Sequence, residues 1–168
     1  PVSNTVEAAV RMRDAARKSN RIIQIGTQQR SWVHFMEAAR LFHEGAVGST
    51  IRHVVMHPPG GGGGAGAPPA DQRTMAQMPA DPIPEGFNWE MFQGPAARRP
   101  FLTSRRNWRG WFAYGGGGIT DWGVHLMDIV QWGIGQDRPL NVQALGGSYQ
   151  GGAGADNYET IEAIFEFP

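Results

Sequence analysis

Apolar residues recur at helical spacing in three parts of the chain, and each part is predicted to form a helix. The first helix begins at a cap formed by Ser3 or Asn4 and stops at the Ser19-Asn20 pair. The second covers residues 32–42, in which the large apolar side chains lie three or four positions apart. The third covers about residues 119–134 and follows a run of four glycines.

Four segments have the pattern of β-strands. Residues 21–25 form a nearly continuous β-branched run, which is typical of a strand covered on both faces. The others are residues 50–57, 141–145 and 158–167, and in the last of these apolar and polar residues alternate. A helix followed by a buried strand is half of a βαβ unit, whereas the later strands have an antiparallel character. The sequence therefore predicts an α/β chain with a domain junction near residues 27–31.

The composition limits what the chain can do. Of its 168 residues, 40% are hydrophobic, which is enough to bury a core, and 15 basic residues balance 15 acidic ones. This balance argues against binding to nucleic acid or to an anionic membrane surface, and no apolar stretch is long enough to span a membrane. The absence of cysteine excludes disulfides, thiol catalysis and cysteine-built metal sites.

Residues 58–70 consist of glycine, proline and alanine, and we expect a flexible surface loop there, with a lid as the alternative. The chain begins at Pro1 with no signal-peptide pattern and ends at Pro168, directly after a strand-like alternation. We therefore expect it to be an internal piece of a longer protein.

Asp121, His125 and Asp128 form the sharpest chemical pattern in the sequence. On a helix, positions i, i+4 and i+7 lie on one face, so the three side chains are predicted to line up. A carboxylate one turn from an imidazole favours the protonated ring, a pairing suited to moving a proton to or from a hydroxyl group. The alternative is a purely structural role for all three residues.

A metal site is a second alternative for this helix. His53 and His57, which lie on one face of a predicted strand, could join Asp121 and His125, with or without Asp128, as ligands. The spacing matches no strong metal-binding motif, so the sequence predicts no metal.

Two further segments carry side chains suited to ligand binding. Residues 26–31 form a polar stretch at the carboxyl end of the first predicted strand, where open α/β sheets bind ligands. Arg105, Arg106, Trp108 and Arg109 combine guanidinium and indole groups, which could hold a sugar or a nucleotide. The alternatives are a polar loop in the first case and a packed tryptophan with solvated arginines in the second.

Six motifs are distributed along the chain. They are Pro-Val-Ser before the first helix, Ile-Gln-Ile-Gly-Thr-Gln-Gln-Arg-Ser at 23–31, Trp89-x-x-Phe92-x-Gly94-Pro95, Asn107-Trp108-Arg109, Gly-Gly-Gly-Gly-Ile-Thr-Asp-Trp-Gly-Val-His-x-x-Asp at 115–128, and the Glu-Phe-Pro ending. Together they resemble the Gfo/Idh/MocA oxidoreductases, which include relatives of glucose–fructose oxidoreductase and inositol dehydrogenase. The resemblance covers nearly the whole chain, and its most specific part is the glycine run followed by Asp-x-x-x-His.

The resemblance implies a two-domain enzyme. An N-terminal Rossmann domain would bind NAD or NADP, and an α/β (α+β) domain would follow, with an open, mostly antiparallel sheet flanked by helices. Residues 1–27 would be the last helix and strand of the Rossmann domain, and residues 28–168 would form the substrate and oligomerisation domain, incomplete at its C-terminus. The implied reaction is hydride transfer between a carbinol carbon of a sugar or polyol and the nicotinamide, in a homo-oligomer.

The resemblance also assigns residue roles. His125 would transfer the proton of the substrate hydroxyl, and Asp121 would orient the substrate and His125. The other positions would contact the nicotinamide (Thr27, Gln28 and Arg30) or the substrate (Trp108, Arg109 and Thr120).

The chain departs from the family in its cofactor half. The family's glycine fingerprint for dinucleotide binding, its ribose-binding acidic residue and most of its parallel sheet are not found, and the Glu and Lys of its Glu-Lys-Pro motif would lie just before Pro1. We therefore expect the isolated chain to be inactive and to bind NADH negligibly. Two other functions stay open: cleavage of glycosidic bonds with transient use of the cofactor, as in some relatives, and a non-catalytic carbohydrate-binding or oligomerisation module.

Overall fold

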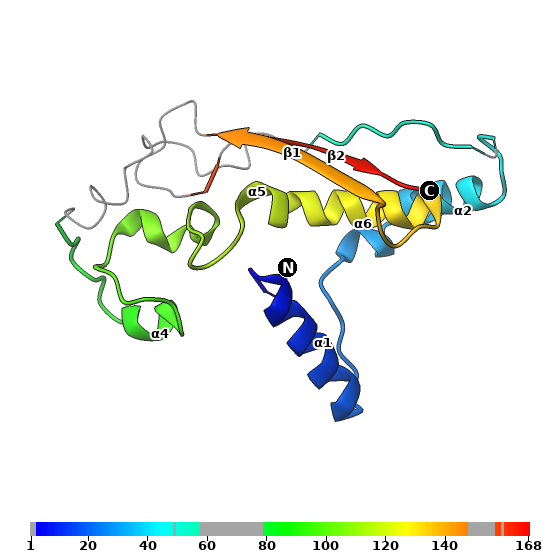
Figure 1. The fold of residues 1–168 in the computed structure, drawn as a ribbon. Coiled ribbons are helices and arrows are strands. Elements are labelled where there is room, and N and C mark those ends of the chain that lie inside the picture. The colour runs from blue at the N-terminus through cyan, green and yellow to red at the C-terminus, as the bar shows by residue number, and fades with distance from the viewer. Residues whose placement is uncertain (1–2, 49, 58–78, 148–156, 159) are drawn as a thin grey trace.

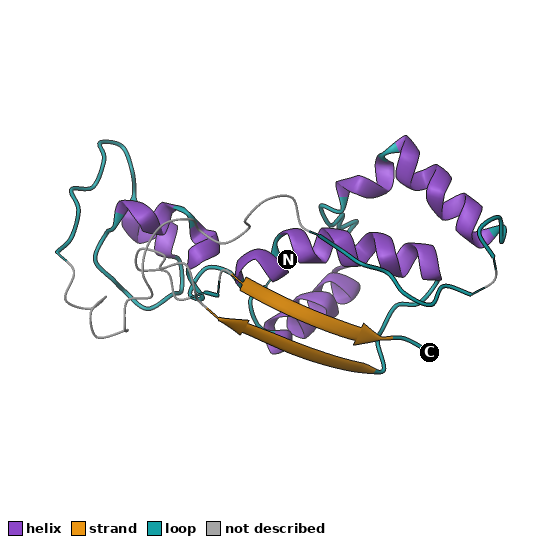
Figure 2. Ribbon diagram, turned by 90° about the horizontal axis from the view of Figure 1, so that it is seen from above, coloured by secondary structure: helices purple, strands orange, loops and turns teal. Residues whose placement is uncertain are grey.

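Over the residues that it describes, the computed structural model consists of helices, loops and one small antiparallel sheet (Figures 1 and 2). This confirms the predicted α/β class. The low-complexity segment at 58–70 lies outside the residues that the structure describes. Those residues are 3–48, 50–57, 79–147, 157–158 and 160–168.

The first helix, α1, spans Val6–Ser19 and stands apart from the other elements. Its N-cap is Thr5, one residue after the predicted cap at Asn4, and the Thr5 hydroxyl accepts the N–H of Ala8 at 3.2 Å. Asn20 ends the helix in the left-handed conformation, with φ 51°. No residue of α1 is buried, and Figure 1 shows the helix projecting from the rest of the molecule.

The segment 21–25 after α1 does not form the strand that the sequence predicts. It is extended, it pairs with no strand among the described residues, and the side chains of Ile22, Ile23 and Ile25 are largely exposed. A buried strand needs hydrogen-bonded neighbours and cover on both faces, and the described part of the chain supplies neither. The strand expected at 50–57 is not formed either, for the same reason.

Helices α2 (Val33–His43) and α6 (Trp122–Ile134) pack against each other and against the 3₁₀ turn η1 (Gln28–Ser31). Nε2 of His43 lies 2.8 Å from the carbonyl oxygen of Trp132, which links the two helices. The bounds of α2 fall within one residue of those that the apolar spacing predicts. None of the described helices is long and apolar enough to cross a membrane.

Aromatic rings pack around the short helix α4 (Trp89–Gln93). Trp89 is buried, and its indole Nε1 donates to the carbonyl oxygen of Arg99 at 2.9 Å. Two 3₁₀ turns, η2 (Thr103–Arg106) and η3 (Trp108–Gly110), follow Phe101 along the chain and lead to Tyr114 and the glycine run. The rings of the cluster belong to Phe87, Trp89, Phe92, Phe101 and Tyr114.

The sheet consists of β1 (Asn141–Gly147) and β2 (Thr160–Glu166), which run antiparallel with Ala144 opposite Ala163. The odd-numbered residues of β2 are half-buried and the even-numbered ones are exposed, as the alternation predicts. Figure 1 shows the pair of strands running over α5 (Gly117–Thr120) and α6. The candidate site, in contrast, lies on η3 and on the glycine-led helices α5 and α6.

Candidate functional site

The glycine run at 115–118 leads to a junction between two helices rather than to one continuous helix. Helix α5 ends at Thr120, and Asp121, with φ −98° and ψ −88°, separates it from α6. The N–H of Asp121 donates to the carbonyl oxygens of Gly117 and Gly118 at 3.1 and 3.2 Å. The predicted single helix from residue 119 is therefore divided, and Asp121 stands at the division instead of in a first turn.

The carboxylate of Asp121 is bound by Arg109 of η3. Nε of Arg109 donates to Oδ2 of Asp121, and the guanidinium carbon lies 4.6 Å from the centre of the Trp108 ring. The Asp121 side chain is 15% exposed and that of Arg109 is 41% exposed, so solvent reaches the pair from the arginine side. The structure thus brings together one predicted catalytic residue and two residues predicted to contact substrate.

His125 lies in the first turn of α6 and takes no part in this ion pair. Its Nδ1 is buried without a hydrogen-bond partner in the described part of the chain, and no hydrogen bond joins it to Asp121. The ring of Trp122 lies edge-on, with 6.0 Å between the ring centroids. The predicted support of the imidazole by the Asp121 carboxylate is therefore not seen.

Asp128 binds Arg30 and ties η1 to α6. Nε and Nη2 of Arg30 each donate to a carboxylate oxygen of Asp128 at 2.8 Å, and the guanidinium lies 5.3 Å from the centre of the Trp132 ring. These hydrogen bonds raise the pKa of Arg30, so the side chain stays charged. Asp128 therefore has a partner of its own, and no hydrogen bond among the described residues joins it to Asp121 or His125.

The turn η1 places two neighbouring glutamines differently. Gln28, which we predict to contact the nicotinamide, is exposed, whereas Gln29 is buried and its Oε1 has no hydrogen-bond partner among the described residues. Thr27 precedes the turn and makes no side-chain cap. No sequence signal singles out Gln29, because the 3₁₀ turn forms against α2 and α6, which lie later in the chain.

The hydroxyl of Thr120, a predicted substrate contact, closes the turn that precedes it. Oγ1 accepts the N–H of Gly116 at 2.9 Å and donates to the carbonyl oxygen of Gly117 at 3.3 Å. The run also needs glycine for close approach, because a Cβ on Gly115 would lie 2.8 and 2.9 Å from two carbons of the Trp108 ring. The indole of Trp108 therefore packs directly on the backbone of the run.

We expect Gly115→Ala to lower the free energy of unfolding by about 1–3 kcal/mol, because the added methyl group would overlap the indole of Trp108. Gly26→Ala is the matched control, since a Cβ there meets no atom within 4 Å; its effect should stay within about 1 kcal/mol. Urea unfolding followed by tryptophan fluorescence measures both changes. Equal stabilities of the two variants would contradict the packing of Trp108 on the glycine run.

Asn157 is a further component of the site that the sequence does not reveal. It is buried between η3 and the glycine run, and its side chain donates to both backbones. It precedes β2 in the chain, with no motif or spacing that distinguishes it.

The described residues do not assemble a metal site. No three His, Cys, Asp or Glu side chains among them lie close enough to hold a metal ion. His53 and His57, which the metal alternative adds to Asp121 and His125, are exposed on the extended segment 50–57. The arrangement gives the metal alternative no support.

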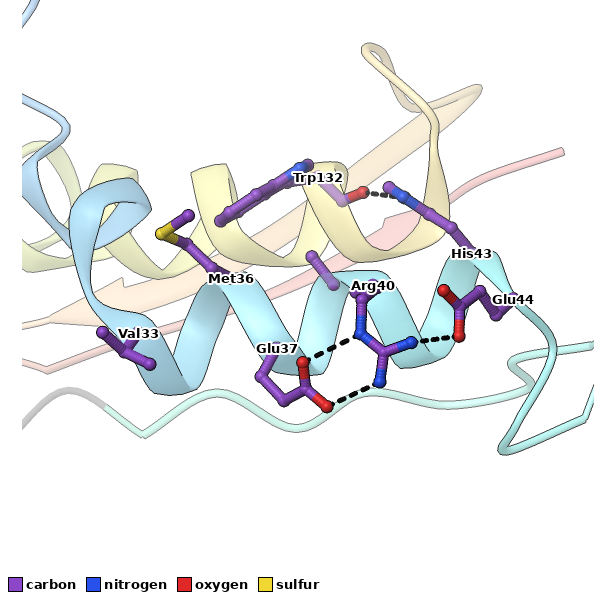
Figure 3. Close-up of a pocket in the computed structure, with 8 residues that line it drawn as sticks. Val33, Met36, Glu37, Arg40, His43, Glu44 and Trp132 are labelled. Carbon is purple, nitrogen blue, oxygen red and sulfur yellow. Dashed lines mark hydrogen bonds and ion pairs between the residues drawn. The ribbon is translucent and has the colours of Figure 1, made fainter.

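A surface pocket lies between α2 and α6 (Figure 3). Its charged side chains bind one another: both carboxylate oxygens of Glu37 accept from Arg40, and Glu44 accepts from Nη1 of Arg40. These hydrogen bonds, first those with Glu37 and then that with Glu44, raise the pKa of Arg40. We therefore do not assign the candidate site to this pocket. Its lining residues are Val33, Met36, Glu37, Ala39, Arg40, His43, Glu44 and Trp132.

The implied cofactor, NAD or NADP, is not fully provided for by the described residues. A dinucleotide binds at the carboxyl ends of parallel strands, with its pyrophosphate on backbone donors. In the described ranges the segment 21–25 forms no strand, and the guanidinium of Arg30 is already bound to Asp128. These residues therefore do not fit the whole cofactor by themselves.

One comparison with known proteins identifies a family. The family model described as "Oxidoreductase family, C-terminal alpha/beta domain" matches residues 72–164, which is more than half of the chain. No curated protein and no solved structure matches. The matched segment contains Arg109, Asp121, His125 and Asn157, so the groups that form the candidate site lie within it.

Proposed function

Because the chain belongs to the Gfo/Idh/MocA family of oxidoreductases, we propose that the full-length protein transfers hydride between a carbinol carbon of a sugar or polyol and NAD or NADP. The observation that carries the proposal is the Arg109–Asp121 pair at the start of the helix that bears His125. A guanidinium beside a carboxylate offers donors and acceptors to neighbouring hydroxyl groups. Sugars and polyols present such hydroxyl groups on adjacent carbons.

In the proposed reaction a proton and a hydride leave the same alcohol group. His125 takes the hydroxyl proton as the carbonyl forms and returns it in the reverse direction. Asp121 and Arg109 hold the substrate hydroxyls so that this proton faces the imidazole. When bound, the nicotinamide supplies the hydride acceptor, and Thr27, Gln28 and Arg30 are the residues of this chain that we propose contact it.

The full-length protein should reduce NAD⁺ or NADP⁺ in the presence of D-glucose or myo-inositol, which the absorbance of the reduced nicotinamide measures. The isolated 168-residue chain is the control. It should oxidise neither compound and show no saturable NADH fluorescence at micromolar concentrations, because hydride transfer needs the cofactor held against the substrate.

Three outcomes would change the proposal. Saturable NADH binding by the isolated chain would contradict the proposal that most of the cofactor site lies in another part of the full-length protein. Release of an aglycone from a glycoside without net NADH would identify a glycoside-cleaving enzyme instead. A full-length protein that binds sugars and turns none over would replace the enzyme with a non-catalytic module.

A further inference from the structure

Asn157 stands between two segments of the proposed site. Only 6% of the residue is exposed. Its Nδ2 donates to the carbonyl oxygen of Arg109 at 2.7 Å and to that of Gly115 at 3.1 Å, and its backbone N–H donates to the carbonyl oxygen of Gly110 at 3.2 Å. One buried residue thus binds the backbone of η3 and the backbone of the glycine run at the same time.

The first of these segments carries one member of the charged pair, and the second leads to the other. The first carbonyl group belongs to Arg109 itself, and the second belongs to Gly115, which begins the glycine run that precedes Asp121. A buried carbonyl left without a donor is unfavourable, so both segments are held where the amide of Asn157 can reach them. We infer that Asn157 is a positioning residue, which holds Arg109 against Asp121 so that the pair can bind substrate hydroxyls. This inference rests on the function proposed above.

An aspartate at this position would keep the shape of the side chain and lose its donors. The space around the residue is limited, since a Cβ on Gly117 would lie 3.3 Å from Cβ of Asn157. In Asn157→Asp a carboxylate oxygen would face the two carbonyl oxygens, and neither hydrogen bond would form. This variant therefore removes the positioning contacts with little change of volume.

The first measurement follows the reactivity of Arg109 in the full-length protein. Phenylglyoxal modifies arginine side chains, and mass spectrometry of peptides gives the rate at each arginine. In Asn157→Asp we expect Arg109 to react about three- to tenfold faster, because η3 is freed from the glycine run. Arg30, which is held separately by Asp128, should react at the wild-type rate.

The matched control is Asn88→Asp. Asn88 uses its oxygen, because Oδ1 accepts the N–H of Met91 at 2.9 Å at the start of α4. An aspartate can accept the same hydrogen bond, so this variant should leave the reactivity of Arg109 unchanged.

The second measurement is steady-state kinetics with D-glucose and myo-inositol. Asn157→Asp should raise KM about tenfold and change kcat less, because Arg109 is proposed to bind the substrate and not to move the proton. A residue that only stabilised the fold would lower the amount of active protein and leave KM unchanged.

The outcomes separate the inference from the proposed function. Unchanged reactivity of Arg109 with unchanged KM would overturn the inference, and so would equal acceleration at Arg109 and Arg30, which would mean general loosening. Faster reaction at Arg109 alone, in a protein that oxidises neither compound, would retain the positioning role and remove the function. If circular dichroism shows that Asn157→Asp does not fold, Asn157→Ser, which keeps one donor, is used; failure of both to fold would overturn the inference.

Discussion

Replacement of His125 by alanine should lower kcat of the full-length protein about 10²- to 10⁴-fold, with little change in KM. Nδ1 of His125 has no hydrogen-bond partner in the described part of the chain, so the change removes a proton carrier without breaking a hydrogen bond of that atom. Substrate affinity is proposed to depend on Arg109 and Asp121, which the substitution leaves in place. Steady-state kinetics measures kcat and KM with the sugar or polyol that the full-length protein oxidises.

His53→Ala is the control for this experiment. His53 is exposed on the extended segment 50–57, so its removal should change neither constant. An unchanged kcat in His125→Ala would contradict the enzymatic role of this histidine and would favour the non-catalytic module.

Asp121→Asn should lower kcat/KM about tenfold. The substitution keeps the shape of the side chain and removes the charge that binds Nε of Arg109. Asp121 itself is mostly shielded from solvent, but the side chain of Arg109 is 41% exposed. Because solvent screens the pair, the expected loss of kcat/KM is small for a hydrogen bond between charged groups. Steady-state kinetics of the full-length protein provides the measurement.

A double-mutant cycle shows whether the two side chains act as a pair. Arg109→Gln should cost about as much as Asp121→Asn, and the double variant should be little worse than either one. Asp14→Asn is the matched control, because Asp14 pairs with Arg13 at 2.8 Å on the exposed helix α1. Losses that add in the double variant would show that Arg109 and Asp121 act independently.

The elements that sequence predicts well are those whose pattern is local. The apolar spacing over 32–42 fixes α2 because one face of a helix must be covered, and the helix observed is Val33–His43. The alternation at the end of the chain likewise fixes which side chains of β2 are half-buried, because successive residues of a strand point to opposite faces. The same local reasoning places Asp121 and His125 four residues apart at a glycine-led helix.

The contacts that sequence does not predict join residues far apart in the chain. Arg30 and Asp128 are separated by 98 positions, and Asn157 is 48 positions from Arg109, so no spacing rule connects them. The break between α5 and α6 at Asp121 cannot be predicted from the sequence either, because the apolar pattern over 119–134 continues through it without interruption. The assignment of residues 1–27 and 28–168 to two domains stays a prediction.

The extended segment 21–25 has a consequence for preparing the protein. Among the described residues no strand pairs with this segment, so its backbone beside exposed Ile22 and Ile23 provides an edge to which another copy of the chain can add as a strand. Aggregation is therefore expected to begin here when the chain is produced alone at the concentrations that crystallisation needs. Ile22→Lys would introduce a charge that opposes this aggregation, and because Ile22 is fully exposed the substitution removes no packing contact.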